Sequence, residues 1–260
     1  MVPLETPAEV EFKEEFELFR REVEEATQHF YGYLSINSVS QGRRPVLKLL
    51  NEAATLWNTA NAAFQVSAVI TLHRVFDTTS KHNVYTLLRL MEQQRETIFS
   101  REALANRKLR HMRGEHPSWL DEYVAEAYVP TAKDFRALRK QVAANARIYA
   151  ANYKAIRDKI FAHREVAKPE ETQALYSKTN IRELQKIFAF LNQMYKAILE
   201  LLENGRRPVL RPTRYSVASI RKNREPGWYQ RGVQQIIVHE VDDFFDAATR
   251  DRRHGKRPPR

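Results

Sequence analysis

Apolar side chains recur every three or four residues along most of this 260-residue chain, and this spacing constrains its fold more than any other feature. Near the N-terminus the steps alternate between four and three residues, at Phe12, Phe16, Phe19, Val23, Ala26, Phe30 and Tyr33. Such spacing gathers the apolar side chains on one face of an α-helix, which then packs against other helices. The sequence contains no internal repeat and no alternating strand pattern, and it therefore predicts an all-α helical bundle.

The same spacing predicts where the other helices lie. We expect a loop at residues 37–45 and further helices at residues 46–76, 83–94, 101–112, 118–128, 131–165, 180–204 and 232–248. Ser100 and Asn180 are of the type that caps a helix start, and Thr131 with Asp134 resembles a capping box. Gly205 suits the end of a helix.

Composition excludes several classes of protein. The chain has no cysteine, which rules out disulfides, thiolate zinc sites and iron–sulfur clusters. Its 7 glycines include no glycine-rich phosphate loop. The N-terminus lacks the pattern of a signal peptide, and no apolar run approaches the roughly 18 residues of a membrane span. We therefore expect a cytoplasmic protein with no membrane association, no bound metal and no cofactor.

Positive charge is concentrated at the C-terminus. The net charge is +11, and residues 205–260 hold 14 Lys and Arg against 6 Asp and Glu, so they supply +8 of it. A cationic excess attracts polyanions such as RNA, although a merely basic soluble protein has the same composition. We predict a helical bundle at residues 1–204, a basic C-terminal extension with one helix at residues 205–249, and a disordered basic tail at residues 250–260.

Cations in the extension are interleaved with aromatic side chains, which is a pattern that suits single-stranded RNA. The candidate RNA-binding residues here are Arg221, Lys222, Arg224 and Trp228. The alternative is an arm whose aromatic side chains dock onto the bundle, and the sequence does not decide between the two.

The residues that best suit catalysis lie near the end of the predicted helix at residues 131–165. They are Arg157, Asp158 and His163. An arginine fork matches the oxygens of a phosphate, and histidine exchanges protons near neutral pH. Together they suit RNA cleavage, in which a 2′-hydroxyl loses a proton and the phosphorus centre gains negative charge. The alternative is structural, because a histidine in a last helical turn also favours the helix dipole.

Helical geometry argues against a site within one chain. Six steps of roughly 100° leave Arg157 and His163 about 120° apart around the helix axis. A symmetric dimer would bring two such helix ends, with both copies of each residue, into one cleft. We therefore expect a homodimer.

The spacing Arg157-x5-His163, with Asp158 directly after the arginine, resembles the R-x(4–6)-H motif of the HEPN superfamily. The segment Ile-Arg-Asp-Lys-Ile-Phe-Ala-His-Arg is similar to sequences of the abortive-infection AbiU-type subgroup. A second resemblance lies at residues 57–64, which lead to Arg74 and Asp77 at the end of a predicted helix. The resemblance covers about residues 12–203. Arg74 and Asp77 are one helical turn apart, and we expect them to form an ion pair; the alternative is that they border the cleft.

The resemblance implies a helical bundle that dimerises and cuts RNA without a metal ion, as a toxin or phage-defence effector that an antitoxin or other partner protein restrains. It implies that Arg157 stabilises the scissile phosphate, His163 transfers a proton or contacts the phosphate, and Asp158 orients the pair. Lys159 and Arg164 are then candidate RNA contacts. Glu165 replaces the tyrosine that a nucleotidyltransferase partner modifies in some related toxins. The alternatives are a non-catalytic HEPN module that binds RNA, a nucleotide or a protein, and a helical interaction protein in which the motif is structural.

Overall fold

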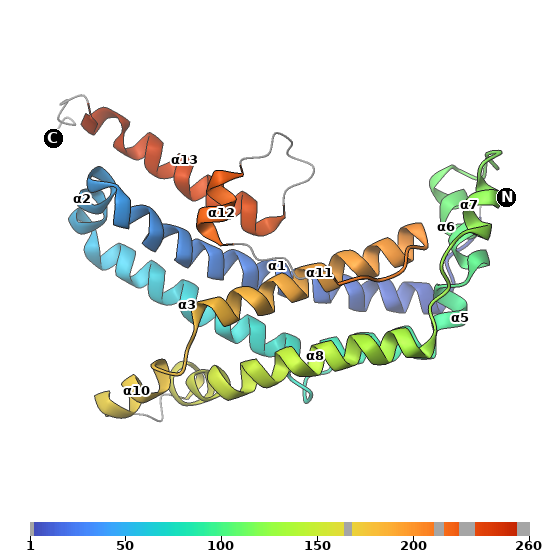
Figure 1. The fold of residues 1–260 in the computed structure, drawn as a ribbon, viewed down its shortest axis with the longest axis horizontal. Helices are drawn as coiled ribbons and strands as arrows, with labels where there is room; N and C mark the ends of the chain where they lie inside the picture. The colour runs from blue at the N-terminus through green and yellow to red at the C-terminus, as the bar shows by residue number, and fades with distance from the viewer. Residues whose placement is uncertain (1–2, 164–167, 211–215, 224–231, 254–260) are drawn as a thin grey trace.

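The computed structural model describes residues 3–163, 168–210, 216–223 and 232–253, and these residues form helices and connecting segments without any strand (Figure 1). The predicted all-α fold is confirmed. In chain order the elements are α1 (Pro7–Gly42), α2 (Arg44–Glu52), α3 (Ala54–Phe76), α4 (Val84–Gln93), α5 (Arg95–Ile98), α6 (Arg101–His111), α7 (Leu120–Ala125), α8 (Ala132–Asn152), α9 (Lys154–Ile156), the π-helix η1 (Arg157–Ala162), α10 (Pro169–Tyr176), α11 (Ile181–Asn204), α12 (Val217–Lys222) and α13 (Val233–Arg253). Within the described ranges, no helix combines the length and apolar character that crossing a bilayer requires.

Helix α1 is the central helix of the bundle, and α3 and α13 lie along opposite sides of it in Figure 1. Its start is fixed by a capping box, in which the backbone N–H of Glu9 donates to Thr6 Oγ1 at 3.2 Å and the N–H of Thr6 donates to Glu9 Oε2 at 3.1 Å. The apolar stripe predicted for this helix is buried from Phe12 to Phe30. These side chains share one large core with α3, α4, α8 and α11.

The ends of several helices differ from the prediction. Residues 37–42 continue α1 instead of forming a loop, because Val39 is buried and Asn37 donates to the Tyr33 carbonyl and to Asn61. The predicted helix at residues 46–76 is divided into α2 and α3 at Ala53, whose backbone (φ −126°, ψ 46°) is not helical. Pro169 starts the unpredicted helix α10, since a proline is tolerated at the first helical position.

The C-terminal extension contains two described helices where one was predicted. The short α12 is capped by Ser216, whose side chain accepts from the Ser219 N–H at 3.0 Å, and a six-residue helix is too short to show periodic spacing. Helix α13 continues to Arg253, past the predicted start of a disordered tail, and residues 254–260 lie outside the described ranges. Val217, Ile220 and Val238 belong to the same core as α1, so this part of the chain packs on the bundle. The division into domains stays a prediction.

Candidate active site

The Arg157–His163 motif lies on a π-helical turn. Helix α8 ends at Asn152, Tyr153 (φ −124°, ψ −26°) interrupts the helical path, and the short α9 leads directly into η1. The N–H of His163 donates to the carbonyl of Asp158, five residues back, at 3.2 Å. Such wide turns are rare and occur frequently at functional sites. The prediction of one continuous helix to residue 165 is therefore wrong, because α8, α9 and η1 take its place up to Ala162.

Arg157 and Asp158 form an ion pair on this turn, and Lys154 Nζ lies 2.9 Å from Asp158 Oδ2. Both side chains of the pair are half-buried, at 26% and 29% exposure. Burial raises the pKa of Asp158, but hydrogen bonds from Lys154 and Arg157 outweigh it and hold this pKa below its usual value. Asp158 is therefore ionised at neutral pH and holds one edge of the guanidinium, whose remaining N–H groups can meet a phosphate.

The end of α3 completes a polar cluster around Arg157, which we define as Arg157, Asp158, His73, Asp77 and Tyr149. The His73 ring is buried, 6.0 Å from the Tyr149 ring, and its Nε2 lies 3.5 Å from Asp77 Oδ2. Burial lowers the pKa of His73, and the charge of Arg157 lowers this pKa further. Burial also raises the pKa of the Tyr149 phenol, against the opposing charge of Arg157. Both His73 and Tyr149 are therefore neutral at pH 7.

Sequence reasoning missed His73 and Tyr149. Tyr149 has the spacing of an apolar position on its helix, and His73 lies inside the segment that leads to Asp77. His73 Nδ1 and the Tyr149 hydroxyl are buried without a hydrogen-bond partner among the described residues. Buried polar atoms are rarely left in this state, and their position beside Arg157 is consistent with a functional role.

The ion pair expected between Arg74 and Asp77 is not formed. Arg74 lies 2.8 Å from Glu22 and 3.4 Å from Glu25, both on α1. Asp77 follows the last residue of α3 with an extended backbone (φ −73°, ψ 107°), so the helical spacing no longer applies to it. Its carboxylate accepts from the N–H and hydroxyl of Thr79 at 3.0 and 2.7 Å.

The other predicted residues of the motif are more open. His163 is exposed, and its ring forms no hydrogen bond or ion pair with another residue of the described ranges. Lys159 is exposed on η1. Arg164 lies outside the described residues. The structure thus brings Arg157 and Asp158 together and leaves His163 on the surface, where a second molecule can reach it.

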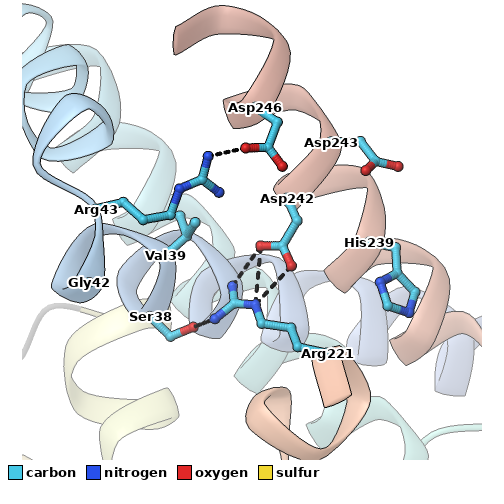
Figure 2. A pocket seen from close by; sticks show the side chains of 9 residues that line it. All are labelled: Ser38, Val39, Gly42, Arg43, Arg221, His239, Asp242, Asp243 and Asp246. Atoms are coloured by element: carbon cyan, nitrogen blue, oxygen red, sulfur yellow. Dashed lines mark hydrogen bonds and ion pairs between the residues drawn. The ribbon is translucent and has the colours of Figure 1, made fainter. Parts of the chain in front are cut away.

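Arg221 lies in a different place, in a pocket of about 310 Å³ between α1, α12 and α13 (Figure 2). Its guanidinium forms three hydrogen bonds to Asp242, two of them at 2.8 Å, and also donates to Ser38. Asp243 and Asp246 line the same pocket. An RNA phosphate would have to displace Asp242 from Arg221, and RNA binding by this arginine stays a prediction.

The remaining predicted contacts of the extension are not tested by this geometry. Lys222 is exposed next to Arg221 and stays a candidate RNA contact. Arg224 and Trp228 lie outside the described residues.

Comparison with known families matches residues 9–218 to the HEPN_AbiU2 family, described as AbiU2. The match covers the polar cluster and the whole π-helical turn. Searches of curated proteins and of solved structures gave no match.

Proposed function

The chain belongs to the HEPN AbiU2 family, and we propose that it is an endoribonuclease that cuts RNA without a metal ion through Arg157 and His163. The observation that carries the proposal is the Arg157–Asp158 ion pair, set on a π-helical turn against the buried His73 and Tyr149. An oriented, permanently charged guanidinium is one of the groups that stabilise a phosphoryl transition state.

The reaction that fits these groups is attack of a 2′-oxygen on the adjacent phosphorus. The 2′-hydroxyl loses its proton, the 2′-oxygen bonds to phosphorus, and the bond from phosphorus to the 5′-oxygen breaks as that oxygen takes up a proton. The products are a 2′,3′-cyclic phosphate and a 5′-hydroxyl. Arg157 stabilises the charge that develops on the phosphate oxygens, Asp158 orients Arg157, and His163 moves a proton.

An exposed His163 fits a site shared between two copies of the chain. Helix α3 is largely apolar around its circumference, which is typical of a buried helix, yet its first half is exposed. Leu56 (64% exposed), Thr59 and Ala63 follow one stripe of this half. Helix α3 also packs on η1, so a two-fold dimer through the stripe would be formed by the helix that supports the motif. We propose this homodimer as the active form.

Membership of the AbiU2 family supports a role as a toxin or phage-defence effector that acts on RNA in the cytoplasm and is restrained by a partner protein. In this role the polar cluster is the centre that a partner would have to block. This biological role is part of the proposal.

The test is cleavage of a mixed RNA pool in EDTA by the wild type, Arg157→Ala and His163→Ala. Arg147→Ala is the matched control, because Arg147 is exposed on α8 and its loss changes the net charge equally. The wild type and the control should cut and leave 2′,3′-cyclic phosphate ends, and the other two should not. If all four proteins are folded and none cuts, retained RNA binding would favour the non-catalytic HEPN module instead. Leu56→Glu should give a monomer by analytical ultracentrifugation and lose cleavage with it.

A further inference from the structure

An apolar pocket lies beside the polar cluster, between α1, α3, η1, α10 and α11. We call it the aromatic pocket, since five of its lining side chains are aromatic: Phe30, Tyr33, Tyr153, Phe161 and Tyr176. Its volume is about 220 Å³. Pockets for drug-sized ligands are commonly 300–1,000 Å³, so this pocket fits a smaller group, such as one flat ring system.

The aromatic pocket is continuous with the polar cluster along two elements. On one side Ile156 lines the pocket and directly precedes Arg157, and Phe161 belongs to the same π-helical turn. On the other side Val69 lines the pocket one helical turn before His73 on α3. A ligand group in the pocket is therefore a near neighbour of whatever Arg157 binds.

The lining also contains polar groups that can form hydrogen bonds with the edge of a ring. Gln65 carries an amide that both donates and accepts, and this side chain has no hydrogen-bond partner among the described residues. Tyr33 adds a hydroxyl group, and the Thr179 hydroxyl, which donates to the Tyr176 carbonyl, adds an acceptor. Lys159 is exposed on η1 and adds positive charge for a sugar–phosphate backbone.

We propose that the aromatic pocket holds one unstacked nucleobase of a single-stranded RNA whose phosphate lies at Arg157. This inference rests on the proposed function and assigns the place where a base of its substrate binds. Single strands can splay a base onto aromatic side chains, whereas a base in a duplex must first leave its stack. The enzyme should therefore cut single-stranded segments in preference to duplexes, and Gln65 should bias it toward one base.

The test uses a single-stranded RNA pentamer with 2-aminopurine at its centre and a methyl group on every 2′-oxygen, so that it cannot be cut. The fluorescence of 2-aminopurine falls when the base stacks on an aromatic ring. Wild-type protein should quench it in a saturable titration, and Tyr176→Ala should weaken binding by about 5-fold to 150-fold. Tyr176, at 37% exposure on α10, is the most accessible ring of the pocket, so its loss should leave the fold intact.

Two further variants separate stacking from structural effects. Tyr176→Phe keeps the ring and should bind like the wild type. Trp119→Ala removes a similarly exposed ring (43%) at the start of α7, at the opposite end of the molecule from α10 (Figure 1), and should also bind like the wild type. Equal binding by Tyr176→Ala and the wild type would overturn the pocket's role.

The outcome distinguishes this inference from the proposed function. If the wild type cuts natural RNA but neither quenches 2-aminopurine nor prefers the pentamer to one with an abasic centre, the pocket is wrong and the ribonuclease stands. If quenching depends on the Tyr176 ring but no RNA is cut, the pocket stands and the ribonuclease is wrong.

Discussion

Replacing Glu9 with glutamine should destabilise the protein more than any comparable change at its surface. Glu9 and Arg107 form an ion pair that is almost fully buried, at 3% and 2% exposure, with Nη1 of Arg107 2.9 Å from Glu9 Oε1. Arg110 reaches the same oxygen at 3.0 Å. Arg107 also donates to the carbonyls of Ile98 and Leu202, at 2.7 and 3.1 Å. One guanidinium thus connects α1 with α6 and α11.

The magnitude follows from what the substitution leaves behind. Glu9→Gln keeps the volume but removes the carboxylate that pairs with the buried charge of Arg107. Breaking one partner out of a buried pair costs about 3–5 kcal/mol, and glutamine retains one acceptor, so we expect about 3 kcal/mol. For a chain of this length that corresponds to a fall in Tm of about 6–12 °C.

The assay is urea and thermal unfolding followed by circular dichroism. Glu5→Gln is the matched control, because Glu5 is 39% exposed and pairs with Lys13 and, at 4.0 Å, with Arg110. Loss of such a surface pair should cost less than about 1 kcal/mol. If the two variants unfold with the same free energy at pH 7, the desolvation of the pair cancels its attraction and our reasoning is wrong.

Acid should reduce the difference between wild type and Glu9→Gln. Burial raises the pKa of Glu9, but hydrogen bonds from the Thr6 N–H, Arg110 and Arg107 outweigh it and hold this pKa below 4.5. A carboxylate with a depressed pKa stabilises the fold above its unfolded-state pKa and loses that effect as the pH falls through the folded-state pKa. The two unfolding free energies should therefore converge below about pH 4.5.

Three further predictions concern the site and the C-terminal helices. Arg157→Lys should lower kcat for RNA cleavage by on the order of 10²-fold with little change in KM, since an ammonium group keeps the charge but lacks the fork; an unchanged kcat would reject the transition-state role. The lowered pKa of His73 means that the unfolded chain binds its proton first, so the wild type should lose up to about 1.4 kcal/mol of stability per pH unit below about pH 6.5. His73→Gln should lack this part of the loss in unfolding at pH 7.5 and 5.5, and parallel pH slopes would contradict the assignment. Asp242→Asn should cost about 1.5 kcal/mol in urea unfolding, because it breaks the paired contact with Arg221; a change below about 0.5 kcal/mol would mean that α13 is held by apolar packing alone.

Most of the bundle could be predicted from the sequence because its helices are long and amphipathic. The stripe of α1, the caps at Ser100 and Thr131, and Gly205 in the left-handed conformation (φ 57°) are all found where the pattern placed them. The break at Ala53 could not be predicted, since alanine favours helix and the interruption depends on how α2 packs at the end of α1. Short helices such as α12 have too few residues for periodic spacing.

The site was only half predictable for a related reason. Arg157, Asp158 and His163 lie within seven residues, so a local motif can reveal them. His73 lies on another helix, and its proximity to Arg157 depends on the packing of α3 against η1. Neither its spacing nor its residue type distinguishes it from a histidine on an ordinary helix end. Such a residue can be found only once the tertiary contacts are known.

The π-helical turn explains how one short segment can serve both the polar cluster and the aromatic pocket. In an α-helix each residue advances by about 100°, so that side chains four apart share a face. A turn closed by a hydrogen bond from residue i+5 advances by less per residue, so Phe161 lies on the other side of Arg157 around the axis from the place that an α-helix would give it. Phe161 then lines the aromatic pocket while Arg157 lies close to His73 and Tyr149 at the end of α3. In the proposed reaction, Arg157 binds the phosphate and Phe161 contacts the base, so the two groups of the RNA bind at separate places on the same turn.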